Sequence, residues 1–201
     1  MIAFSYVTLS GGIQVEYVEP IRDIEKINMI KKILRNQSQR DLLLFVFGIN
    51  TGIRVNELLS LKVSDVKSGE NMNEFIYLYD GNTEEGKAYY INHRIQLELK
   101  NYFKLHDLKE EDFLFKSRKN NQPITRQQAY RIINKAAKEA GIPGKIGMHT
   151  LRKTFGYHAY RKGIAISIIK EIYHHHSPSE TLKYIGIDKH DKGLVKVDVN
   201  L

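Results

Sequence analysis

The sequence contains no cysteine, and it has no long hydrophobic run. A chain without cysteine forms neither disulfides nor thiolate metal sites, and a reducing cytoplasm is the location we expect for it. No apolar stretch approaches the roughly 20 residues that cross a membrane. Residues 1–12 lack the cationic start and apolar stretch of a signal peptide. We therefore expect no membrane segment, and the length of 201 residues suits one globular domain with short extra ends.

Acidic residues are outnumbered by basic ones. The chain has 31 Lys and Arg residues against 23 Asp and Glu residues, which gives a net charge of +8 and an isoelectric point near 9.4. A basic domain attracts phosphate backbones, because neutralised phosphates release their counterions. Charge alone is not specific, since many basic proteins bind no nucleic acid. The composition therefore permits a nucleic-acid partner without requiring one.

Apolar periodicity predicts a mostly helical chain with one small sheet. Thr125 and Gln128 fit a capping box, which places a helix start there. Two aromatic and aliphatic segments flank the turn-forming residues 80–82, a pattern typical of a β-hairpin. The predicted helices are 22–35, 40–49, 55–61, 95–103, 125–140, 149–161, 164–172 and 180–187, and the predicted strands are 75–79 and 87–92. The expected fold class is mainly α with a small antiparallel β-sheet (α+β).

Two short segments pair an arginine with a second functional group three residues away. Arg54 and Glu57 follow a Thr-Gly break, and i, i+3 residues share a helix face, so Glu57 can orient the guanidinium. His149 and Arg152 have the same spacing, which lets a proton-exchanging imidazole and a phosphate-binding guanidinium point into one pocket. Taken singly, each pair also fits an ordinary solvated helix face.

A third segment near the C-terminus holds three consecutive histidines, His174 to His176, followed by Tyr184. An isolated tyrosine near a chain end usually packs half-buried, with its ring apolar and its hydroxyl wet. Adjacent histidine side chains do not easily converge on one ion, and no acidic or thiolate ligand pattern accompanies them. We therefore expect no metal site here.

The order and spacing of these three segments resemble the tyrosine recombinase family. That family carries a Thr-Gly-x-Arg-x-x-Glu-Leu segment, which residues 51–58 match, and a His-x-x-Arg pair, which residues 149–152 match. A His-Ser-Ser-Pro-Ser segment and a Tyr-Ile-Gly segment follow in many members. Alignment on Pro178 places the family histidine at His175, and Tyr184 then falls at the position of the family tyrosine. The resemblance implies the fold of a tyrosine recombinase catalytic domain.

The family's catalytic lysine is the element that this sequence matches least closely. It lies in the turn of a β-hairpin, but here the turn, residues 80–86, contains glutamates at positions 84 and 85. Lys87 is the candidate, and the alternative is that it only solvates the start of a strand. His174 stands where the family usually has Gly or Asn, and His176 replaces a small Ser. These bulky neighbours leave open whether His175 or His176 reaches the site.

The resemblance implies a site-specific DNA recombinase or integrase that needs neither metal nor ATP nor any other cofactor. Tyr184 would attack the scissile phosphate and form a 3′-phosphotyrosyl bond, as in phage and mobile-element integration and recombination. Each remaining group has an implied role: phosphate binding by Arg54, Arg152 and His175, general-base action by His149, protonation of the leaving 5′-oxygen by Lys87, and support of the site by Glu57. Double-stranded DNA is the implied partner, bound by a homo-tetramer that is monomeric or weakly associated without DNA.

Domain boundaries follow from the extent of these motifs. We predict a catalytic domain over residues 20–188, preceded by a linker or the remnant of an upstream segment at 1–19. Residues 189–201 are predicted to be a tail that packs on a neighbouring subunit, or else one that frays or folds back. The chain is either a natural short form or the catalytic part of a longer protein.

Three alternative functions share parts of this pattern. A DNA-binding regulator could keep the fold without strand exchange, and the imperfect lysine position favours that alternative slightly. A type IB topoisomerase-like enzyme would use the same chemistry without a partner duplex. A metal-dependent nuclease would use the histidine cluster and would be sensitive to EDTA.

Overall fold

The computed structural model describes residues 18–79, 86–144 and 146–187. Most of them are helical, as predicted, and the strands form small antiparallel sheets. The helices are α1 (Ile24–Gln37), α2 (Gln39–Thr51), α3 (Val55–Ser60), α4 (Val63–Val66), α5 (His93–Leu105), α6 (Arg126–Glu139), α7 (Met148–Arg161), α8 (Ile166–Tyr173) and α9 (Pro178–Tyr184). The strands are β1 (Lys67–Ser68), β2 (Asn71–Met72), β3 (Phe75–Tyr79) and β4 (Gly86–Tyr90).

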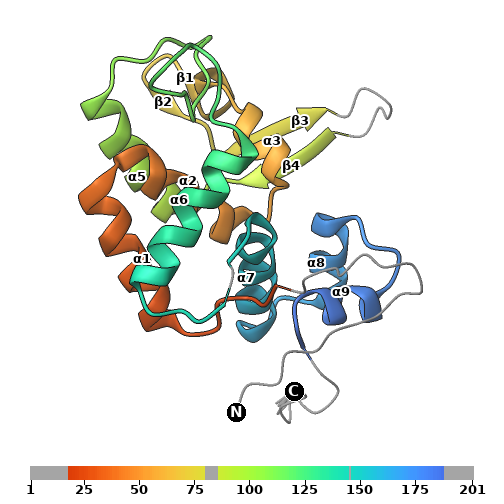
Figure 1. Ribbon diagram of the computed structural model, residues 1–201. Coiled ribbons are helices and arrows are strands. Elements are labelled where there is room, and N and C mark those ends of the chain that lie inside the picture. The colour runs from red at the N-terminus through yellow and green to blue at the C-terminus, as the bar shows by residue number, and fades with distance from the viewer. Residues whose placement is uncertain (1–17, 80–85, 145, 188–201) are drawn as a thin grey trace, which may run out of the picture.

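Helix α2 forms the centre of the large hydrophobic core. Every residue from Leu42 to Gly48 is buried, so this helix needs neighbours on all sides. Helices α1, α5 and α7 contact it and supply that cover, as the arrangement in Figure 1 shows. Helix α7 packs tightly against Gly48, where an added Cβ would lie 2.6 Å from Leu151 Cδ1. The core thus fixes the position of α7, which carries the predicted His149 and Arg152.

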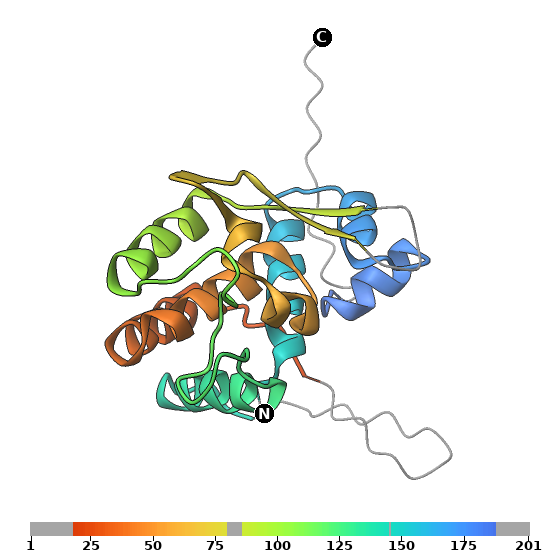
Figure 2. The ribbon, with the colours of Figure 1, turned by 90° about the horizontal axis from the view of Figure 1, so that it is seen from above.

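Strands β3 and β4 form a ribbon with two different faces. Ile76 pairs with Tyr89 and Leu78 with Lys87, and the pleat turns these residues to one side. Ile76 and Tyr89 are buried, whereas Tyr77 is exposed on the other side. In both views the ribbon runs across the helices toward the part of the molecule that holds α8 and α9 (Figures 1 and 2). Lys87 therefore lies on the face of the ribbon that is turned toward the protein.

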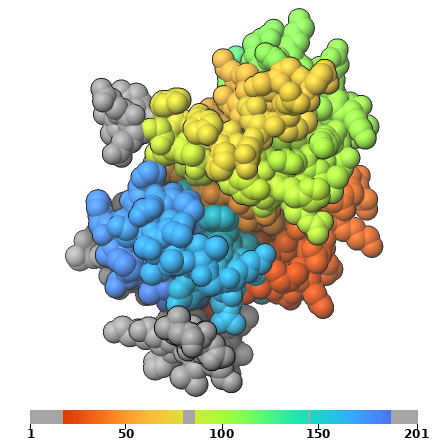
Figure 3. Space-filling view, turned by 180° about the vertical axis from the view of Figure 1, so that it is seen from behind, coloured from red at the N-terminus to blue at the C-terminus, as the bar shows by residue number. Residues whose placement is uncertain are grey.

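A second, much smaller hydrophobic cluster joins α8 and α9 to the end of α7. Its buried members are Ile169, Tyr173, Ile185 and Ile187. The residues of α8 and α9, blue in the space-filling view, gather on one side of the molecule next to the yellow strands (Figure 3). The predicted Tyr184 packs against this small cluster, whereas the predicted Arg54 and Arg152 lie on segments that the large core positions.

Several local features differ from the prediction. Helix α4 and the β1–β2 ribbon were not predicted, because two-residue strands and a four-residue helix are too short to show a period. Helix α9 begins at Pro178 and not at residue 180, since the Ser177 hydroxyl accepts the Glu180 N–H and Pro178 suits a first helical position. The capping box predicted at Thr125 is confirmed.

The predicted tail at 189–201, most of the predicted linker at 1–19 and most of the hairpin turn lie outside the described residues. The domain boundaries drawn from the sequence therefore stay predictions. Among the residues that the structure describes, no helix combines the length and the apolar character needed to cross a membrane.

Candidate active site

Arg54 stands at a sharp break between α2 and α3. Gly52 ends α2 with a φ of 67°, and a Cβ there would lie 2.5 Å from Phe155 Cδ1, so both conformation and space favour glycine. The chain then turns so that Arg54 caps α3, and its N–H donates to the Glu57 carboxylate at 3.1 Å. The Arg54 side chain is 50% exposed. Its guanidinium is therefore open to a ligand.

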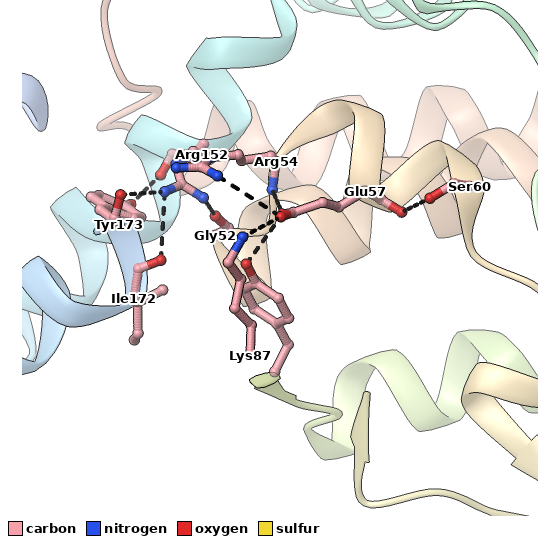
Figure 4. Close-up of polar contacts among 9 residues, drawn as sticks. Gly52, Arg54, Glu57, Ser60, Lys87, Arg152, Ile172 and Tyr173 are labelled. Carbon is pink, nitrogen blue, oxygen red and sulfur yellow. Dashed lines mark hydrogen bonds and ion pairs between the residues drawn. The ribbon is translucent and has the colours of Figure 1, made fainter. Parts of the chain in front are cut away.

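Glu57 holds Lys87 more closely than it holds the Arg54 guanidinium. Lys87 Nζ donates to one carboxylate oxygen at 2.9 Å, and the Tyr89 hydroxyl donates to the other at 3.2 Å, whereas Arg54 Nη1 lies 4.0 Å away. Figure 4 shows Lys87 reaching from β4 to this carboxylate. Burial alone would raise the pKa of Glu57, but hydrogen bonds from Lys87, the Arg54 backbone and Tyr89 bring it below the ordinary value. The carboxylate thus stays ionised beside the ammonium.

Arg152 connects the end of α2 to the end of α8. It is only 7% exposed, and its guanidinium donates to the carbonyl oxygen of Gly52 and, at 3.2 Å, to that of Tyr173, as drawn in Figure 4. The guanidinium carbon lies 4.3 Å from the centre of the Tyr173 ring. A planar guanidinium held by carbonyl groups and an aromatic face has a fixed orientation.

His149 lies three residues before Arg152 and contacts a second arginine. Its Nε2 is 3.2 Å from Nη2 of Arg126, which begins α6. A guanidinium only donates, so the imidazole accepts at Nε2 and holds its proton at Nδ1. Burial lowers the pKa of His149, and the charges of Arg126, Lys153 and Arg152 lower it further. A neutral imidazole is the form that can accept a proton.

The three histidines have different environments. His174 ends α8 with a φ of 53°, which explains why Gly or Asn suits this position. The His175 ring faces inward, with Nδ1 3.1 Å from the Thr181 hydroxyl, whereas His176 is exposed and its N–H donates to the Glu180 carboxylate. Burial lowers the pKa of His175, and although Glu180 raises it, the charges of Arg152 and Arg54 also lower it. The structure brings His175, and not His176, to the site.

Tyr184 is the last residue of α9 and is half-buried. Its ring lies edge-on to those of His175, at 5.0 Å between centres, and Tyr173, at 5.4 Å. Burial raises the pKa of Tyr184, while a hydrogen bond and the charge of Arg152, together with the charge of Arg54, act in the opposite direction. The phenol thus lies in the field of both predicted arginines.

These side chains surround one pocket of about 360 Å³. It is lined by Arg54, Val55, Asn56, Glu57, Arg126, Met148, His149, Arg152, Tyr173, His174, His175 and Tyr184. Lys87 donates a hydrogen bond to Glu57, one of these lining residues. Within the described residues, no three His, Asp or Glu side chains are grouped so as to hold a metal ion. The site combines positive charge, imidazoles and a phenol, a set suited to binding a phosphate and attacking it.

Three residues of this region were missed by sequence reasoning. Arg126 starts a helix remote in sequence, Tyr173 directly precedes the histidines, and Lys153 follows Arg152. Only Lys153 gave a signal, since it lies four residues after His149 and so near its face of the helix. The other two are brought in by tertiary contacts.

The sequence model of the phage integrase family matches residues 22–190. The chain is 42% identical over 172 residues to the probable integrase/recombinase YoeC of Bacillus subtilis, covering 86% of this chain and 91% of YoeC. It is 29% identical over 175 residues to the tyrosine recombinase XerA of Pyrococcus furiosus, covering 86% of this chain but 59% of that protein. Against such longer relatives, the chain spans little more than half the length.

Solved structures support the same fold. The crystal structure of XerA recombinase superposes with a TM-score of 0.71 at 24% identity, over 90% of this chain and 64% of that one. The catalytic domain of bacteriophage HP1 integrase superposes with a TM-score of 0.60 at 22% identity, over 86% of this chain and 90% of that one.

Fold and relatives together define the tyrosine recombinase class, and the fold is that of its catalytic domain. The chain belongs to the phage integrase family. The predictions of fold, family and enzyme class made from the sequence are thereby confirmed.

Proposed function

We propose that this protein is a site-specific DNA recombinase that cleaves and rejoins strands through a covalent bond between Tyr184 and a 3′-phosphate. The observation that supports this most strongly is the single pocket that gathers Arg54, His149, Arg152, His175 and Tyr184. Arg54 and Arg152 lie on segments that the large core positions, while Tyr184 packs against the small cluster. A phosphate between them would meet two guanidinium groups and one phenol.

Charge neutralisation is the first requirement for attack on a phosphodiester, because its negative charge repels a nucleophile. Arg152 is already oriented by carbonyl groups and the Tyr173 ring, so its remaining N–H groups lose little conformational freedom when they bind the phosphate. Arg54 is exposed and supplies the second, more adaptable contact. His175 would add a hydrogen bond from its ring to the same phosphate.

The strand-cleavage step moves two protons. The Tyr184 phenol gives its proton to neutral His149, the phenolate oxygen bonds to phosphorus, and the bond from phosphorus to the 5′-oxygen breaks. Lys87 gives a proton to that leaving oxygen, and Glu57 keeps the ammonium in place. Arg126 would release His149 Nε2 as DNA enters, because both groups would then have phosphate oxygens to contact.

Rejoining reverses these steps with a different 5′-hydroxyl. One phosphodiester is exchanged for one phosphotyrosyl bond, so little bond energy is lost and no ATP is needed. The two arginines take the place of a metal ion in offsetting the charge of the transition state. We accordingly propose a mechanism without metal or other cofactor.

DNA is the proposed partner. The net charge of +8 suits it, and similar structures include XerH bound to its difH substrate and a lambda integrase dimer bound to a core site. The bound DNA belongs to those proteins, and we extend the DNA partner to this chain on the strength of the shared fold and the pocket. We also propose that the protein acts as a homo-tetramer on DNA and that the tail helps to build this tetramer. The proposed place of action is the cytoplasm.

A suicide duplex tests the proposal. The duplex is nicked near the scissile position and built from the ends of the element that carries the gene, and EDTA is present throughout. We expect an adduct that survives SDS in the wild-type protein, that is lost in Tyr184→Phe, and that is kept in the matched control Tyr77→Phe on the exposed face of β3. An adduct that persists in Tyr184→Phe contradicts the choice of nucleophile.

Other outcomes point to the alternative functions. DNA binding without any adduct favours a non-catalytic regulator. Relaxation of supercoils without a partner duplex favours a topoisomerase-like enzyme. Cleavage that EDTA abolishes favours a metal-dependent nuclease.

A further inference from the structure

Lys153 is a buried lysine that the mechanism above does not use. It is 4% exposed, although lysine is among the residues least often fully buried. It follows Arg152 on α7, and its Nζ lies 5.2 Å from the centre of the Tyr184 ring. A cation at this distance from an aromatic face is attracted by the ring's electrons. The buried ammonium therefore lies against the proposed nucleophile.

Among the described residues, Glu19 and His149 are titratable groups that interact with Lys153. Glu19, in the segment before α1, acts on the ammonium as a favourable negative charge, which partly offsets the effect of burial. His149, one turn earlier on α7, carries a pKa that the Lys153 charge helps to lower. On the side of α9, the Tyr184 ring is the group in contact. Burial lowers the pKa of Lys153 to about 8, so the ammonium is mostly protonated at neutral pH.

We infer that Lys153 is a positioning residue for the nucleophile: its ammonium, set against the ring face of Tyr184, favours the phenolate that attacks the phosphate. This inference rests on the proposed function. A neutral phenol ring offers the cation only its quadrupole, whereas a phenolate adds a full negative charge spread over the same ring. The contact is therefore stronger once the proton has left, and a contact that strengthens along the reaction lowers its barrier.

Lys153 keeps its own proton in this role. The phenol proton leaves to His149, and the phosphorus–oxygen bonds form and break as described above. Because the benefit depends on the charge, it is present below pH about 8 and is lost as the pH rises through that value. Arginine at position 153 would keep the charge at higher pH, and methionine would remove it at similar length.

Cleavage rates of three proteins test the inference. We expect Lys153→Met to form the adduct about tenfold more slowly than wild type at pH 7, because a cation–ring contact lowers the barrier by an amount that corresponds to about that factor in rate. The ratio of wild-type to Lys153→Met rates should approach one by about pH 9.5, while the ratio of Lys153→Arg to Lys153→Met stays high. Ratios that do not change with pH overturn the inference. If Lys153→Met does not fold, wild type and Lys153→Arg compared over the same pH range still decide.

A titration without DNA separates this inference from the proposed function. Tyrosine labelled with ¹³C at Cζ is followed by NMR, and the Tyr184 signal is identified by its loss in Tyr184→Phe. Wild-type Lys153 is already neutral where a buried tyrosine ionises, so the informative pair is Lys153→Arg and Lys153→Met. We expect the Tyr184 midpoint at lower pH in Lys153→Arg. Equal midpoints contradict the inference, whether or not the protein cleaves DNA.

Discussion

The two hydrophobic clusters that the described residues form differ in size and in the functional groups they position. The large core around α2 positions Arg54, Lys87 and Arg152, whereas the small cluster of α8 and α9 positions His175 and Tyr184. The large core fixes α7 between several helices. Among the described residues the small cluster has four buried members, and regions with few buried apolar contacts open at lower free energy. The backbone segments that carry Arg54 and Arg152 are thus held more firmly than those that carry His175 and Tyr184.

One junction links the two clusters. Tyr173 is buried under the Arg152 guanidinium, its hydroxyl donates to the Arg152 carbonyl oxygen, and its ring touches those of His175 and Tyr184. Gly156 makes room for it, since a Cβ there would lie 2.4 Å from the Tyr173 hydroxyl. The comparison therefore predicts that changes at this junction affect catalysis more than equal changes inside the large core.

Loss of Arg152 should have the largest effect, because this side chain serves both clusters and the phosphate. We expect Arg152→Ala to slow adduct formation by roughly 10²–10³-fold, the usual cost of removing one preorganised donor to a transition state. Single-turnover cleavage of the suicide duplex measures it. Arg152→Lys should recover little, because an ammonium cannot replace the planar fork. Full activity of the lysine variant would show that charge alone matters.

Two glycine substitutions compare the junction with the core. Gly156→Ala and Gly48→Ala each place a Cβ within 2.6 Å of a neighbouring side chain, so each should lower the free energy of unfolding by about 1–3 kcal/mol. Urea unfolding measures that loss. Under conditions where both variants are folded, Gly156→Ala should cleave DNA more slowly than Gly48→Ala. Equal cleavage rates would contradict the special role of the junction.

Removal of the Tyr173 hydroxyl should have a smaller effect. Tyr173→Phe keeps the ring under Arg152 and loses one buried hydrogen bond, which contributes about 1 kcal/mol to stability. Chemical denaturation measures the loss, and cleavage should be nearly unchanged. A drop in cleavage as large as that of Arg152→Ala would mean that the hydroxyl, and not the ring, orients the site.

Acid should lower the stability of the folded protein modestly. Burial lowers the pKa of His174, with the charges of Lys87, Arg54 and Arg152 adding to it, and the pKa values of His149 and His175 are lowered as well. The unfolded chain then binds more protons than the folded one, so stability falls as the pH drops through about 6.5 toward 5. Asparagine tolerates the left-handed backbone of His174. His174→Asn should therefore lose less stability than wild type between pH 7 and pH 5 in urea unfolding, and an equal loss would contradict this cause.

Most elements could be predicted because their residues carry a clear period or cap. Strand β3 was placed at its observed bounds, and α6 began at the Thr125 capping box. The β1–β2 ribbon was missed because its strands, in which Lys67 pairs with Met72 and Ser68 with Asn71, are too short to show a sequence period. The start of α9 was misplaced because the cap at Ser177 is a short-range contact that apolar spacing does not reveal.

The sequence by itself determined the class of chemistry, because the order and spacing of the motifs that hold Arg54, His149, Arg152 and Tyr184 resemble those of the tyrosine recombinases. Only the tertiary structure decided which groups meet. In the folded protein the site contains His175 and not His176, Glu57 accepts a hydrogen bond from Lys87, and Arg126 contacts His149. The tertiary structure also set Lys153 against the Tyr184 ring. The physical reason is that hydrogen bonds, ring contacts and desolvation act over a few ångströms in space, across chain separations that no local pattern encodes.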